Sequence, residues 1–183
     1  MKVTRYGMLI DNSSCVGCHA CQIACQNQWQ LPYNEHFIDV HTFEKGTYPN
    51  VNIENFTTQC NHCDDPPCMR ICPTYATYKR QDGLVLVEEK KCIGCKGCIV
   101  ACPYNARIWS EKYHVPEKCK FCADFIATGE TPACVNTCVT KARMFGDLDD
   151  PNSEISKEII KKRAVPLKAE LGTKPRIYYI RQI

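Results

Sequence analysis

The sequence predicts an α+β fold of two small modules whose cores are organised around cysteine side chains. Three observations predict it: 16 of the 183 residues are cysteine, the cysteines fall into four groups of four, and short extended segments flank or connect these groups. Outside cysteine, only Leu, Ile, Val and Phe supply much apolar bulk, so the hydrophobic core is thin. We therefore expect whatever the cysteines bind to stabilise the fold, and the chain not to fold without it.

The third cysteine group has the most informative spacing. Residues 92–103 read C-x2-C-x2-C-x3-C-P, the run with which bacterial ferredoxins hold [4Fe–4S] clusters. The first three thiolates bind one cluster, and in two-cluster ferredoxins the fourth binds the other cluster. The first group repeats this run, except that Gln26 stands where the third group has Pro103. Without that proline, we expect the helix after Cys25 to continue to about Trp29.

The second and fourth groups are interrupted versions of the same run. Their second and third cysteines are separated by four residues in the second group and by eleven in the fourth. The members of the four groups, in chain order, are Cys15, Cys18, Cys21 and Cys25; Cys60, Cys63, Cys68 and Cys72; Cys92, Cys95, Cys98 and Cys102; and Cys119, Cys122, Cys134 and Cys138. Together they complete the ligand sets of four [4Fe–4S] clusters, which are the predicted cofactors.

Disulfide bonds and structural zinc fit the spacing of the cysteines less well than iron–sulfur clusters do. A disulfide framework is typical of small secreted scaffolds. Structural zinc sites are usually built from pairs of C-x2-C motifs, not from a third cysteine followed by C-x3-C. The formal net charge of +3 counts every cysteine as neutral. With thiolate ligands and four oxidised cluster cores of roughly +2 each, the net charge becomes about −5. We therefore predict no nucleic-acid partner.

The segments before and between the groups predict strands and hairpins. Residues 2–11 predict a short strand. Residues 26–59 form a long connection, which is either a surface loop with a hairpin or a partner-facing insertion. Asp82-Gly83 lies between two extended runs and predicts a hairpin. Only 19 residues separate the second group from the third, so this hairpin links two groups of one compact module.

The region after the fourth group contains no cysteine. Met144 and Phe145 predict an edge strand, and residues 177–180 predict a strand that pairs with the N-terminal strand or clamps a partner subunit. Between them a short helix is expected, with Asp150 as N-cap and Pro151 as its first residue. Its apolar residues are expected on one side of the helix, namely Ile155, Ile159 and Ile160.

Some residues beside the cysteines could shield the clusters or bind metal. Val16, Ile93 and Phe121 are expected to keep water off the clusters, although ordinary core packing explains them equally well. His19 and His62 lie between cysteines, and histidine ligands would indicate a Rieske-like cluster. Because no cysteine is missing from any group, we predict that neither histidine is a ligand.

Spacing alone does not fix which groups share clusters. A tandem scheme joins the first group with the second and the third with the fourth. A nested scheme joins the second with the third and the first with the fourth. The short hairpin between the second and third groups favours the nested scheme, in which the N-terminal half closes onto the C-terminal half.

No segment of the sequence points to export, membrane insertion or catalysis. There is no N-terminal apolar signal segment and no run of about 18 apolar residues. We therefore expect neither a signal peptide nor a membrane span, so that a partner would carry the chain to a membrane. No nucleophile–base pair, phosphate-binding loop or carboxylate pair is apparent, and the chain is predicted not to be an enzyme by itself.

The cysteine groups and their flanks resemble a known family. The motifs CVGCxxC, CNHCxxxPC, DGLVxVxxxxCIGCxxCxxACPY and KCxFC…PACVxxC…GDLDDP are similar to those of the electron-transfer iron–sulfur subunits of the dimethyl sulfoxide reductase superfamily. The small subunits of polysulfide, thiosulfate and respiratory arsenate reductases are the most similar. The resemblance covers almost the whole chain, and it is specific for the type of subunit rather than for the substrate.

The resemblance implies two nested bacterial-ferredoxin-like modules. The implied outer module comprises residues 1–56 and 110–145, the inner module residues 57–109, and the partner-docking tail residues 146–183. The implied ligands are Cys15, Cys18, Cys21 and Cys138 for cluster 1; Cys72, Cys92, Cys95 and Cys98 for cluster 2; Cys60, Cys63, Cys68 and Cys102 for cluster 3; and Cys25, Cys119, Cys122 and Cys134 for cluster 4.

The resemblance also implies a function and partners. Such subunits relay single electrons between a molybdenum or tungsten bis-pterin catalytic subunit and a second redox partner, which in similar complexes is a quinone-reactive membrane subunit. Relatives are often exported folded by a partner's twin-arginine signal, so periplasmic and cytoplasmic locations both fit. The alternative is a free polyferredoxin that carries electrons between enzymes, but such a carrier needs neither the 26–59 connection nor a cysteine-free tail.

Overall fold

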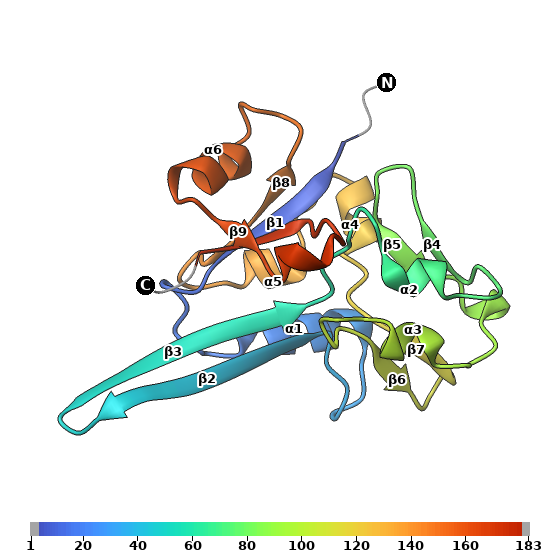
Figure 1. The fold of residues 1–183 in the computed structure, drawn as a ribbon, viewed down its shortest axis with the longest axis horizontal. Coiled ribbons are helices and arrows are strands. Elements are labelled where there is room, and N and C mark those ends of the chain that lie inside the picture. The colour runs from blue at the N-terminus through green and yellow to red at the C-terminus, as the bar shows by residue number, and fades with distance from the viewer. Residues whose placement is uncertain (1–3, 181–183) are drawn as a thin grey trace.

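The computed structural model describes residues 4–180, in which one four-stranded sheet and three two-stranded hairpins form a mixed α/β fold (Figure 1). The strands of the larger sheet are β1 (Tyr6–Asp11), β8 (Arg143–Asp147), β9 (Val165–Pro166) and β10 (Ile177–Ile180), in the order β8-β1-β10-β9. β1 pairs parallel with β10 and antiparallel with β8. The predicted edge strand at Met144 is therefore confirmed, and of the two possibilities left open for residues 177–180 the structure shows pairing with the N-terminal strand. Of the strand predicted for residues 2–11, residues 2 and 3 lie outside the described residues.

The core of the protein joins this sheet to the cysteine groups. Alternate residues of a strand point to the same face, and Met8, Ile10, Ile177 and Tyr179 are almost fully buried. They belong to one apolar cluster with four buried cysteines, Cys25, Cys60, Cys119 and Cys134. The sheet and the cysteine sites therefore share one core.

Three antiparallel hairpins complete the strands. They are β2 (Ile38–Thr47) with β3 (Asn50–Gln59), β4 (Thr77–Lys79) with β5 (Val85–Val87), and β6 (Ile108–Ser110) with β7 (Val115–Glu117). The β2–β3 hairpin projects away from the rest of the molecule (Figure 1). The hairpins predicted within residues 26–59 and around Asp82-Gly83 are confirmed, whereas the β6–β7 hairpin was not predicted.

The helices are short, and all but the last lie within the cysteine groups or begin there. They are α1 (Ala20–Trp29), α2 (Pro67–Arg70), α3 (Gly97–Val100), α4 (Ala123–Ala127), α5 (Ala133–Asn136) and α6 (Glu154–Lys161), with 3-10 turns η1 (Glu89–Lys91) and η2 (Ala169–Leu171). α1 ends at Trp29, as the absence of a proline after Cys25 predicts. Within residues 4–180, no helix has the length and hydropathy needed to cross a bilayer.

Helix α6 begins later than predicted. Its N-cap is Ser153, whose hydroxyl accepts a hydrogen bond from the Ser156 N–H. Asp150 instead accepts from the Asn152 N–H at 2.9 Å and forms the preceding turn. The expectation that three isoleucines share one side is also wrong, because Ile155 is buried whereas Ile160 is exposed. Residues five apart lie about 140° apart around a helix, which separates these two.

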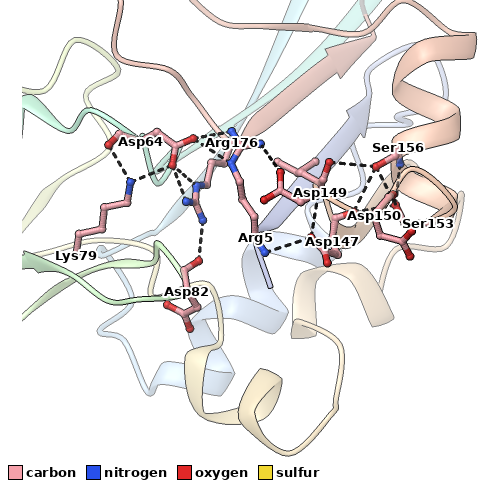
Figure 2. Close-up of polar contacts among 11 residues, drawn as sticks. Arg5, Asp64, Lys79, Asp82, Asp147, Asp149, Asp150, Ser153, Ser156 and Arg176 are labelled. Carbon is pink, nitrogen blue, oxygen red and sulfur yellow. Dashed lines mark hydrogen bonds and ion pairs between the residues drawn. The ribbon is translucent and has the colours of Figure 1, made fainter. Parts of the chain in front are cut away.

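Asp64, in the second cysteine group, forms ion pairs with residues near both ends of the chain (Figure 2). Its carboxylate accepts hydrogen bonds from Arg5 Nη2 at 2.6 Å, Arg176 Nε at 2.7 Å and Lys79 Nζ at 3.0 Å. Its backbone N–H also donates to the Lys174 carbonyl at 2.8 Å. Burial raises the pKa of the Asp64 carboxyl, but the hydrogen bonds from the three cations outweigh burial and hold the pKa well below its usual value.

Candidate metal centres

In all four groups the third cysteine is the second residue of a helix. These residues are Cys21 in α1, Cys68 in α2, Cys98 in α3 and Cys134 in α5. The first-turn N–H groups of a helix lack intrahelical acceptors, and the helix dipole favours negative charge beside them. The backbone therefore favours a thiolate at the same place in the compact and in the interrupted groups.

The loop between the first two cysteines also has the same shape in every group. The residue before the second cysteine has a positive φ: 67° at Gly17, 42° at His62, 67° at Gly94 and 56° at Phe121. At Gly17 a Cβ would also lie 2.5 Å from Asn55 Oδ1, so the Asn55 side chain would have to move. The common backbone shape indicates that all four groups are built for the same kind of ligand.

Three cavities are each bounded by four cysteines, three from one group and one from another. One cavity is lined by Cys60, Cys63, Cys68 and Cys102. A second is lined by Cys15, Cys18, Cys21 and Cys138. A third is lined by Cys72, Cys92, Cys95 and Cys98. Within residues 4–180, no group of three or more His, Cys, Asp or Glu side chains is arranged to hold a single metal ion.

The four remaining cysteines are buried neighbours. Burial raises the pKa of the Cys25 thiol, and the nearby Cys134 and Cys122 raise it further. Burial likewise raises the pKa of Cys119, with further contributions from Cys25, Cys60 and Cys134. This set therefore lies together, and through Cys60 and Cys119 it adjoins the cavity that Cys60 lines.

Several of the buried cysteines need added positive charge to be held as thiolates. Burial raises the pKa of Cys63 to about 12 and that of Cys134 to about 11. Backbone N–H groups near the sulfur atoms are 3.5 Å from Cys72 Sγ, 3.5 Å from Cys92 Sγ and 3.4 Å from Cys119 Sγ. Iron supplies the missing positive charge, and four cysteines per set are the donors that a [4Fe–4S] cluster requires. The residues therefore fit this cofactor.

The two histidines between cysteines are engaged elsewhere. His62 Nε2 lies 2.9 Å from the Cys119 carbonyl oxygen, and His62 Nδ1 accepts from the Val85 N–H at 3.1 Å. His19 Nδ1 lies 3.0 Å from Gln22 Oε1. No ring nitrogen of His62 is left for a metal, in keeping with the prediction that this residue is not a ligand.

Some residues beside the cysteines were misread or missed. Phe121 is buried, but Val16 and Ile93 are 62% and 66% exposed, so the expectation that they keep water off the sites is wrong for the isolated chain. Arg107 and Arg143 were missed. Both are buried, and each follows the fourth cysteine of its group by five residues. That repeated Cys-x4-Arg spacing was the signal available in the sequence.

Comparison with known proteins gives one family. The profile of the 4Fe-4S dicluster domain family matches residues 51–148. The chain is 42% identical to the B subunit of sulfite dehydrogenase from Allochromatium vinosum, over 97% of this chain and 83% of that protein. It is 40% identical to the B subunit of polysulfide reductase from Wolinella succinogenes, over 96% and 94%. It is 39% identical to the B subunit of tetrathionate reductase from Salmonella typhimurium, over 96% and 72%.

Proposed function

Because this chain belongs to the family of iron–sulfur electron-transfer subunits with a 4Fe-4S dicluster domain, we propose that it relays single electrons through four [4Fe–4S] clusters. One end of the relay serves a molybdenum or tungsten bis-pterin catalytic subunit. The other serves a second redox partner, a quinone-reactive membrane subunit. Iron–sulfur clusters supply one-electron chemistry over a range of roughly −700 to +450 mV. The protein holds the clusters, spaces them and adjusts their potentials.

The proposed ligand sets are the nested ones. Three of the four sets coincide with the cysteines that line one cavity each, those of clusters 1, 2 and 3. The fourth set, for cluster 4, is supported by the mutual proximity of Cys25, Cys119, Cys122 and Cys134. A tandem scheme would instead require the fourth cysteine of each group to line the cavity of its neighbour in the chain.

Contacts between the sets support a linear order. Arg107 interacts with Cys98 of cluster 2 and with Cys68 of cluster 3. Cys60 of cluster 3 neighbours Cys119 of cluster 4. A second arginine, Arg143, interacts with ligands of clusters 4 and 1. The order of the relay is therefore 2, 3, 4, 1.

The main support for the proposal is that the clusters at the two ends of the relay, 2 and 1, each have an exposed ligand. Cys95 of cluster 2 and Cys18 of cluster 1 are exposed, whereas the cysteines of cluster 4 are all buried. The connections that carry these two exposed cysteines lie on opposite sides of the molecule, between β5 and α3 and between β1 and α1 (Figure 1). A relay with two partners needs one accessible cluster at each end and shielded clusters between them.

Exposed apolar residues surround both ends at equivalent positions. Val16 and Ile93 follow the first cysteine of the two compact groups, and both are exposed. Ile23 and Val100 follow the third cysteine by two residues, and they are 60% and 87% exposed. Exposed apolar groups beside a functional site are typical of protein–protein contact surfaces. Each end of the relay is therefore suited to a bound protein partner.

Capture of the complex from its native source tests the proposal. An affinity-tagged chain, isolated anaerobically from gently solubilised membranes, should bring down a large subunit with molybdenum or tungsten in near-equal amount, together with a membrane subunit. The isolated complex should pass electrons between a quinol analogue and the large subunit. A chain that elutes alone, near its own mass of 20.9 kDa, would contradict the proposal and support a free carrier.

A further inference from the structure

Two buried arginines have no obvious counter-charge in the protein. Arg107 and Arg143 are each 5% exposed, and neither forms an ion pair with a carboxylate within residues 4–180. Arg107 Nε and Nη2 and Arg143 Nη2 have no hydrogen-bond partner in the same part of the chain. A buried cation is costly unless a negative charge lies close to it. The groups beside these arginines must therefore be negatively charged in the working protein.

The surroundings of the two arginines are similar, although Arg143 Nη1 also donates to Gln59 Oε1 at 2.6 Å. Arg107 Nη1 donates toward Cys98 Sγ at 3.4 Å, and Arg143 Nη1 donates toward Cys134 Sγ at 3.8 Å. In each case the sulfur belongs to the third cysteine of the arginine's own group. Two groups of different spacing, one compact and one interrupted, thus place a guanidinium at the same point.

Each arginine also faces a second cysteine group. Arg107 lines the cavity that Cys68 lines, and although burial lowers the pKa of its guanidinium, Cys68 and Cys98 raise it. Arg143 lines the cavity that Cys21 lines, and although burial lowers the pKa of its guanidinium, Cys134 and Cys21 raise it. In the proposed ligand sets, each of these pairs divides between two clusters: 3 and 2 for Arg107, and 4 and 1 for Arg143. Each module therefore has one buried cation between its two clusters.

We propose that Arg107 and Arg143 are the shared counter-charges of the two cluster pairs, and that each raises the reduction potentials of both clusters in its module. This inference rests on the proposed function. Four thiolates and a core of roughly +2 give each oxidised cluster a charge of about −2, which becomes about −3 on reduction. A fixed buried cation favours the more negative, reduced form. Because one guanidinium serves two clusters, it raises both potentials together and leaves the difference between them little changed.

Redox titration of the intact complex, followed by electron paramagnetic resonance, tests this proposal. Arg107→Gln should lower the potentials of clusters 2 and 3 by about 59 mV or more, the equivalent of a tenfold weaker one-electron reduction equilibrium. Arg143→Gln should do the same to clusters 1 and 4. Clusters 1 and 2 are identified in the spectra by Cys18→Ser and Cys95→Ser. Arg163→Gln, which removes an exposed cation, is the control and should shift none of them.

Two outcomes would overturn the inference. One is that both glutamine variants titrate like the wild type although all four clusters are present. The other is that each variant shifts all four potentials equally, because the charge would then act on the whole chain rather than on a pair. If the wild-type chain itself lacks four clusters, the proposed function fails and not the arginine assignment.

Lysine variants keep the test decisive if a glutamine variant loses iron. Arg107→Lys and Arg143→Lys keep the charge but lack the planar fork that reaches two sulfur sites. Each should lower the potential of one cluster of its pair and leave the other module unchanged. Four unchanged potentials in a fully loaded lysine variant would count against a shared guanidinium.

Discussion

The compact and the interrupted cysteine groups differ in how deeply the protein buries them. In the interrupted groups the first three cysteines are all buried. In the compact groups the second cysteine, Cys18 or Cys95, is exposed. Both kinds of group share the same helix start and the same left-handed residue before the second cysteine. The difference therefore comes from the residues inserted between the cysteines rather than from the local ligand geometry.

The two inserts attach their groups to the rest of the fold. The insert of the second group contains Asp64, which binds three cations from distant segments (Figure 2). The insert of the fourth group contains α4, whose Ala123 and Ile126 are buried. The compact groups have no insert, and their second cysteine stays at the surface. Insert length thus separates the groups that serve the interior of the proposed relay from the groups that serve its ends.

Among these variants, loss of a buried ligand should reduce iron content and folding the most. Cys119→Ser removes a sulfur from the shared core and should prevent an iron-loaded chain from accumulating, because the cluster is part of the fold. Cys18→Ser removes an exposed ligand and should cost at most one cluster, about four irons, with the chain still folded. Iron content and circular dichroism of the two variants measure the difference. Equal losses would show that burial does not distinguish the groups.

Breaking the Asp64 contacts should have an intermediate effect. Asp64→Asn leaves the buried Arg176 with a weaker partner and should cost about 2 kcal/mol, which corresponds to a fall of roughly 4–8 °C in unfolding temperature for a chain of this size.

The neighbouring Asp65→Asn is the matched control. Asp65 pairs with Arg70 at 3.4 Å, and both side chains are largely exposed, so its loss should cost under about 0.5 kcal/mol. Thermal bleaching of the cluster absorbance measures both variants. Identical bleaching temperatures would show that the insert does not anchor the second group.

Charges at the exposed ends should have the smallest effect on the chain itself. Ile23→Asp and Val100→Asp should leave iron content unchanged, because both side chains point to solvent. Each should weaken binding of only one partner, by about tenfold or more. Ala127→Asp alters an exposed residue on α4, far from both exposed cysteines in the chain, and should have no effect on either partner. Binding assays with the separated partners give the result, and loss of both partners from one variant would argue against a two-ended relay.

The sequence predicted the local features best. The spacing of the cysteines placed the four groups, the missing proline placed the end of α1, and Asp82-Gly83 placed the β4–β5 hairpin. Such features depend on residues close together in the chain. The start of α6 was wrong because Asp150 and Ser153 are both good N-caps, and it is Ser153 that accepts the hydrogen bond from the Ser156 N–H.

Features that depend on distant contacts could not be predicted in the same way. The residues alone left two partners open for the C-terminal strand, and its parallel pairing with β1 joins segments about 170 residues apart. Val16 and Ile93 were expected to be shielding residues, because apolar residues near cysteines are usually packed. The buried arginines were missed because arginine is rarely buried without a partner, and here the sulfur sites are the partner.

Iron and acid-labile sulfide analysis of this chain, separated anaerobically from its partners, tests the central claim most directly. The proposed relay predicts close to sixteen irons and sixteen sulfides per chain, four of each for every cluster. About eight irons, the content of a single dicluster domain, or zinc in place of iron, would contradict a relay of four clusters.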